Sequence, residues 1–205
     1  MRLKIPVAIA VAAAIAVAGC GSDSEPAASG HETNTSTSTA GGNGVDRAFV
    51  AAMIPHHESA VDMAGMAEKR GQSGFVKQLA GDIIRTQNSE ITTMRREDAE
   101  LAKAGVKAGE LGVADHAVGM DGDMSMLESA DPFDPAFLEM MIPHHEGAVT
   151  MAKAELARGA DPELKALAQD IIDAQEREIE EMRASGLVPD DTGSNPMDSE
   201  EHSGH

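Results

Sequence analysis

The chain has 205 residues, 41% of them hydrophobic, which leaves room for one medium-sized domain after targeting and linker segments. Its 35 acidic residues against 16 basic ones give a formal net charge of −19. Such a surface repels nucleic acid and anionic lipid headgroups, so phosphate-backbone partners are excluded. Thirteen methionines and eight histidines stand beside four phenylalanines. Abundant methionine is ordinarily core filler, so only its positions can indicate another role.

The N-terminal segment, residues 1–19, has the pattern of a secretory signal. Arg2 and Lys4 precede a short apolar run that ends in small residues. The run VAGC at 17–20 resembles the lipobox of bacterial lipoproteins, which implies cleavage before Cys20 and lipidation of its thiol. We therefore expect the protein to be anchored in the cell membrane and to face its extracytoplasmic side. The alternative is ordinary cleavage that leaves Cys20 as a free thiol.

Two segments flank the expected domain. Residues 20–45 are rich in Gly, Ser and Thr and are predicted to be a flexible tether with a reach on the order of 25–30 Å. Residues 185–205 form an acidic tail that we expect to be disordered. The tail carries Met197, His202 and His205, which are weak ligand candidates.

An internal repeat organises the rest of the chain. The sequence DRAFVAAMIPHHESAVDMAGMAEKRG, from Asp46, aligns without a gap with DPAFLEMMIPHHEGAVTMAKAELARG, from Asp134. The match extends over repeats 46–96 and 134–184, separated by a linker at 97–133. A gapless match at a constant spacing of 88 residues indicates that one supersecondary unit was duplicated.

Each repeat predicts a pair of helices. Asp46 and Asp134 are the expected N-caps of the first helices, and Gly71 and Gly159 are expected to end them. The second helices are expected to start at Ser73 and Asp161. Two such hairpins predict an all-α fold, a four-helix bundle over residues 46–184.

The predicted first helices place histidines on the face that must be buried. This face carries, in the two repeats, Met53, His56, His57 and Met63, and Met141, His144, His145 and Met151. A single histidine there is more often a hydrogen-bonded core residue than a ligand. The recurrence in both repeats, between two methionines, favours a metal site.

The second helices carry polar residues inside their apolar stripe. They are Gln87 and Glu90, repeated as Gln175 and Glu178, close to Met94 and Met182 on the same stripe. Burial of an unpaired carboxylate costs several kcal/mol, so these groups need a partner. A glutamate that accepts an imidazole N–H would turn the other ring nitrogen toward a metal. The alternative is a metal-free His–Glu hydrogen bond that fastens the bundle.

The donor types indicate the metal. No histidine follows a glutamate at the Glu-x-x-His spacing of ferritin-like di-iron sites; the spacing present is Met-x-x-His, at Met53/His56 and Met141/His144. Thioether with imidazole favours soft Cu(I), whereas zinc would leave the paired methionines unexplained. The linker adds accessory candidates in a Gly- and Asp-rich segment, where there is no core to fill: His116, Met120, Met124 and Met126.

The runs MIPHHESAVDMA and MIPHHEGAVTMA, each followed by Gln-x-x-Glu-Ile-x-x-Met at Gln87 and Gln175, resemble the domain-of-unknown-function family 305. The resemblance covers roughly residues 46–184. It implies a ferritin-like four-helix bundle, often exported, and a link to copper, because some relatives are copper-binding proteins of the cell envelope. The second repeat departs from the first by breaking at Ser185-Gly186, where the first runs on through EDAELAKAG.

Together these observations predict an extracytoplasmic copper-binding lipoprotein that sequesters or transfers Cu(I), with other copper-handling envelope proteins as partners and no enzymatic activity. The expected metal ligands are Met53, His56, His57, Met63, Met94, Met141, His144, His145, Met151 and Met182, with Gln87, Glu90, Gln175 and Glu178 in support. Two alternatives stay open: a metal-free helical bundle for interactions in the envelope, and a ferritin-like metal oxidase. The repeat symmetry also predicts that His56→Ala and His144→Ala remove comparable shares of bound Cu(I).

Overall fold

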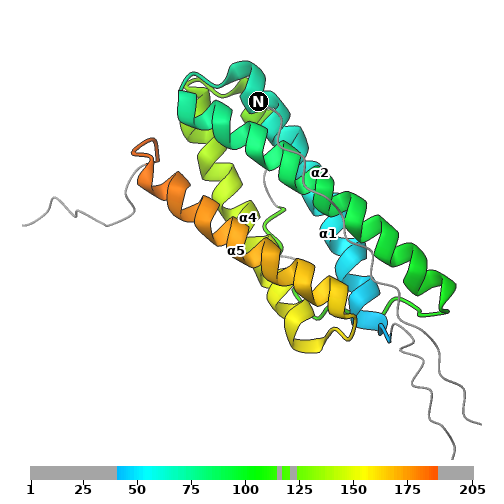
Figure 1. The fold of residues 1–205 in the computed structure, drawn as a ribbon. Helices are drawn as coiled ribbons and strands as arrows, with labels where there is room; N and C mark the ends of the chain where they lie inside the picture. Colours follow the sequence, from blue (N-terminus) through cyan, green and yellow to red (C-terminus); the bar gives the residue numbers. More distant parts are fainter. Residues whose placement is uncertain (1–40, 115–116, 121–123, 189–205) are drawn as a thin grey trace, which may run out of the picture. The chain divides into compact units, whose positions relative to one another are not determined.

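The computed structural model describes residues 41–114, 117–120 and 124–188. These residues form the helices α1 (Gly44–Arg70), α2 (Gly74–Lys103), α3 (Met124–Ser129), α4 (Phe133–Arg158) and α5 (Pro162–Ala184), and no strand (Figure 1). The predicted all-α bundle of two duplicated hairpins is confirmed, and the short helix α3 in the linker is an addition. None of the helices in this part of the chain is long and apolar enough to cross a membrane.

The two hairpins pack against each other mainly through their first helices. α1 lies along α2 and α4 along α5, as Figure 1 shows, and α1 packs on α4 at the centre. α2 and α5 touch at few points. The histidine-bearing helices are therefore the inner pair of the bundle.

The first helices begin earlier than the sequence suggested. Asn43 is the N-cap of α1, in a capping box with Asp46, and Pro132 is the N-cap of α4. The prediction that Asp46 and Asp134 are N-caps is therefore wrong. The predicted starts of the second helices are confirmed, since the side chains of Ser73 and Asp161 cap α2 and α5.

The two misassigned aspartates cap the opposite hairpin instead. Asp134 accepts the backbone N–H groups of Gln72 (2.9 Å) and Ser73 (2.7 Å), ahead of α2. Asp46 in the same way accepts from Ala160 and Asp161, ahead of α5. Burial opposes ionisation of Asp134, but these backbone donors outweigh it and hold its pKa below the usual value. Each hairpin thus supplies a carboxylate that accepts the backbone N–H groups ahead of the second helix of the other hairpin.

Asp134→Ala should lower the free energy of unfolding by about 1–3 kcal/mol at pH 7, because two N–H groups at the start of α2 lose their acceptor. A carboxyl whose folded pKa is depressed stabilises above its unfolded pKa, and that contribution is lost as the pH falls through the folded value. Urea denaturation from pH 7 down to pH 3 should therefore show the two proteins converging. Asp62→Ala, at an exposed site of α1, is the control and should be neutral.

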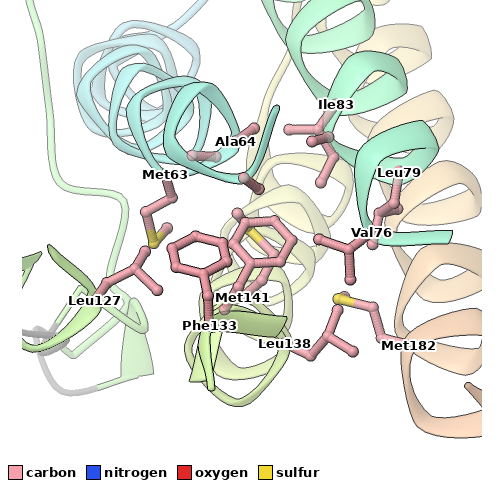
Figure 2. Packing of buried hydrophobic residues seen from close by; sticks show 14 of the residues in the cluster. Met63, Ala64, Val76, Leu79, Ile83, Leu127, Phe133, Leu138, Met141 and Met182 are labelled. Atoms are coloured by element: carbon pink, nitrogen blue, oxygen red, sulfur yellow. The ribbon is translucent and has the colours of Figure 1, made fainter. Parts of the chain in front are cut away.

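The apolar core is divided into two clusters that the 88-residue repeat relates to each other. The first cluster joins the C-terminal half of α1 and the start of α2 to the start of α4 and the end of α5. The second cluster joins the start of α1 and the end of α2 to the C-terminal half of α4 and the start of α5. Figure 2 shows the first cluster, with Met63 beside Leu127 and Phe133, and Met182 beside Leu138. Each cluster therefore contains residues of both repeats.

Part of the linker runs back over the bundle. Residues 117–120 and 124–130, here called the strap, include the buried Leu127 of α3. The Val118 carbonyl lies 2.9 Å from Nε2 of His56 on α1. At the other end, the Arg70 guanidinium donates to the carbonyls of Leu127, Glu128 and Ala130. The strap is thus attached to the first hairpin at both ends.

Candidate metal centre

A buried polar layer separates the two apolar clusters. It is made of the same four side chains from each repeat, all at most 9% exposed: His56, His57, Gln87 and Glu90, with His144, His145, Gln175 and Glu178. All eight were predicted to face the core, and the structure places them there.

One histidine of each repeat is held by a glutamate. Nε2 of His57 lies 2.8 Å from a carboxylate oxygen of Glu90, and His145 and Glu178 repeat this contact at 2.8 Å. This is the predicted pairing. An ionised carboxylate can only accept, so Nε2 donates in this contact and Nδ1 is the ring nitrogen that remains. Neither Nδ1 atom has a hydrogen-bond partner among the described residues.

The other two histidines face each other across the α1–α4 contact. The ring centroids of His56 and His144 are 3.8 Å apart. Burial, followed by the charge of neighbouring histidines, lowers the pKa of His56 to about 3 and that of His144 to about 2. Both imidazoles are therefore neutral at physiological pH, which is the form that binds metal ions.

The layer is short of hydrogen-bond partners. Within the described part of the chain, eight of its buried atoms lack one: both ring nitrogens of His144, Nδ1 of the other three histidines, Oε1 of Gln87 and both amide atoms of Gln175. An unsatisfied buried polar group costs about 1–3 kcal/mol, and native cores contain few. So many in one layer indicate that it accommodates a further species, either water or an ion.

The methionines are grouped differently from the prediction. Met63 shares a core cluster with Met141 and Met182, whereas Met53 and Met94 share the other cluster with Met151. The three methionines proposed as ligands in each repeat are therefore divided between the clusters. Met53 and Met63 lie on the same helix, and the rise of α1 between them, about 15 Å, separates the two sulfur atoms.

One small cavity combines sulfur and imidazole. It has a volume of about 10 Å³, close to the room that a single water molecule needs, so it suits an ion and excludes an organic cofactor. Its lining consists of Met63, Met120, Met124, Met140 and His144, with Ser59 and Gly119. We call this cavity the methionine cleft.

The residues that line the cleft agree only in part with the ligands predicted from the sequence. Met140 was not predicted, because the first repeat has Ala52 at the equivalent position. Met120 and Met124 were predicted as accessory ligands and do line the cleft, whereas Met126 is 68% exposed and outside it. The remaining candidates lie outside the described residues: Cys20, His116, Met197, His202 and His205.

A carboxylate-rich metal site is not formed here. The described residues contain no group of three or more His, Cys, Asp or Glu side chains placed to hold one ion. A di-iron centre of the ferritin type would need such a group. The chemistry that the described residues bring together is thioether with neutral imidazole, a combination typical of soft metal ions.

The fold and this layer define a class of protein: a duplicated helical-hairpin bundle with histidine and methionine side chains at its centre. The family described as "Domain of unknown function (DUF305)" matches residues 20–98 and 46–185, and the chain belongs to it.

Several solved structures resemble the chain. CopM in the Ag-bound form is 36% identical over 68% of this chain and 93% of its own, with a TM-score of 0.59. CopM in the Cu(I)-bound form is 35% identical over 68% and 94%, with a TM-score of 0.57. A DUF305 fragment from Deinococcus radiodurans is 31% identical over 71% and 97%, with a TM-score of 0.59.

One relative of known sequence matches a shorter stretch. The uncharacterized protein L153 of Acanthamoeba polyphaga mimivirus is 49% identical over 51 residues, 25% of this chain. The chain spans about a third (34%) of the length of that relative.

Proposed function

We propose that this protein binds Cu(I) on the extracytoplasmic side of the cell membrane, held there by a lipidated Cys20, and sequesters the ion or transfers it to other copper-handling proteins. One observation carries the proposal: each imidazole of the buried polar layer has a ring nitrogen without a hydrogen-bond partner among the described residues, and the layer lies next to a cleft lined by four methionines. The CopM structures with Cu(I), Cu(II) and Ag support it, since they are similar to this chain over more than 90% of their length.

The donor set favours Cu(I) over harder ions. Thioether sulfur is a soft ligand that binds Mg²⁺, Ca²⁺ or Fe³⁺ poorly, and a neutral imidazole is a good ligand for copper. Because His56 and His144 are neutral at neutral pH, each has one ring nitrogen with a lone pair, and metal uptake there does not compete with protonation. We propose a binding protein with no enzymatic role, since the carboxylate set of a metal oxidase is not assembled in the described residues.

The test is an anaerobic Cu(I) titration of the full chain against a competing chelator. The double variant His56→Ala/His144→Ala should lose most of the tight Cu(I) binding, with its helix content checked by circular dichroism. The matched control is His202→Ala/His205→Ala, which removes two imidazoles from the tail and should bind as the parent does. Full stoichiometry and affinity in the His56/His144 variant would refute a site at the layer and leave a metal-free bundle as the better interpretation.

A further inference from the structure

We infer that the described residues form one asymmetric soft-metal site: the methionine cleft, closed by the strap, with Arg70 as the residue that positions the strap. The inference rests on the proposed function and replaces the two equivalent sites that the repeat symmetry predicted. Met63, Met140 and His144 come from α1 and α4, whereas Met120 and Met124 come from the strap.

The two halves of the layer differ in their free nitrogen atoms. His56 has one ring nitrogen at 2.9 Å from the Val118 carbonyl, whereas neither ring nitrogen of His144 has a partner in the described part of the chain. His144 lines the methionine cleft and His56 does not. His144 is therefore the imidazole that is free to bind an ion beside the sulfur atoms.

Two glycines allow the backbone of the strap to approach the backbone of α4 closely. A Cβ at Gly147 would lie 1.8 Å from the Val118 oxygen, and a Cβ at Gly119 would lie 2.2 Å from the Pro143 oxygen. Gly119 also has a φ of 72°, which disfavours other residues. The first repeat has Ser59 where the second has Gly147, so its surface lacks this close approach.

Arg70 holds the other end of the strap. Its guanidinium donates to three carbonyls at the end of α3, two of them at 2.8 Å (Leu127) and 2.6 Å (Ala130), and its Cζ lies 4.7 Å from the centroid of the Phe133 ring. Arg70 lies two turns after Met63 on α1, and Met124 begins the short helix whose end Arg70 binds. Arg70 thus fixes the short helix that carries Met124, which lines the same cleft as Met63, without being a ligand itself.

Methyl NMR can assign the ligands directly. In the full chain with ¹³C-methyl-labelled methionine, Ag(I), used as a redox-stable probe, should shift the methyl signals of Met63, Met120, Met124 and Met140. The signals of Met53, Met94 and Met151, in the other core cluster, should stay in place. Equal shifts in both groups would mean two symmetric sites and would overturn the inference. If neither Ag(I) nor Cu(I) bound at all, the proposed function itself would fail.

The positioning role of Arg70 has its own test. Arg70→Ala should leave the number of bound Ag(I) ions unchanged but speed their release to a chelator at least tenfold. Arg70→Lys should behave similarly, because an ammonium group cannot reach three carbonyls in the fixed geometry of a guanidinium. Arg158→Ala, the equivalent position in the second repeat, should release the ion at the parental rate. Parental release from Arg70→Ala would rule out this role.

Discussion

Glu155→Gln is expected to raise the free energy of unfolding at pH 8 by roughly 3–5 kcal/mol, the largest effect of a single substitution that this structure predicts. Glu155 on α4 is fully buried, and its carboxyl group interacts with the carboxyl group of Asp46. Burial, followed by the neighbouring carboxylate of Asp46, raises the pKa of Glu155 to about 8. The first repeat has Ala67 at the equivalent position, so the bundle does not need a carboxyl there.

The sign of the pH dependence follows from proton binding. Between pH 4.5 and about 8 the folded protein keeps the Glu155 proton that the unfolded chain releases, so the stability of the parent falls as the pH rises through this window. The glutamine variant does not titrate there. The two proteins should therefore have similar stability near pH 4.5 and should separate by about 1.4 kcal/mol per pH unit up to pH 8.

Urea denaturation at pH 4.5, 6 and 8 measures this difference. Glu139→Gln, at an exposed position of the same helix, is the control and should leave the stability unchanged at every pH. A constant difference between the Glu155→Gln variant and the parent would show that Glu155 is ionised in the folded protein and would contradict the expectation.

Gly147→Ser, which installs the residue of the first repeat, should detach the strap from α4. The new side chain would overlap the Val118 carbonyl and approach the Gly119 nitrogen, both of them backbone atoms, so a rotamer change cannot relieve the clash. Because α4 is held by long helix contacts on both sides, the strap should move instead. We expect a loss of about 1–3 kcal/mol in stability, as for other overpacked sites, and at least tenfold faster Ag(I) release.

Hydrogen exchange of residues 117–120 reports the detachment directly, because their amides should lose protection while those of α4 keep it. Gly65→Ser is the matched control: it makes the same substitution on the inner helix of the first hairpin, where a Cβ meets nothing within 4 Å. Unchanged exchange and unchanged Ag(I) release in Gly147→Ser would show that the cleft does not depend on the strap.

The sequence predicted the parts of the site that repeat. Helical periodicity places His57 and Glu90 on facing stripes, and the spacing of 88 residues confirms each position twice. Helical periodicity could not predict how the two hairpins pack on each other, because that packing depends on which face of one repeat meets which face of the other. Met53 and Met63 are both buried as predicted, but they lie in different clusters because about 15 Å of helix α1 separates them.

Features of the site that differ between the two repeats could not be predicted from the repeat pattern. Met140 was overlooked because its equivalent is alanine, and the inequivalence of His56 and His144 arises from a linker that belongs to neither repeat. The sequence does contain one indication of this asymmetry: the second repeat has Gly147 where the first has Ser59. A glycine inside a helix indicates the close approach of another backbone. Differences between repeats were therefore as informative as their similarity.

The reciprocal caps of Asp46 and Asp134 make the hairpins obligate partners. A hairpin by itself would leave the two amides ahead of its second helix without the carboxylate that accepts them. Because the repeats are joined in one chain, both sets of caps are made within one molecule and need no second copy. Joining the two repeats in one chain also lets the sequence of each repeat vary separately. The segment that connects them can then contact the two repeats differently.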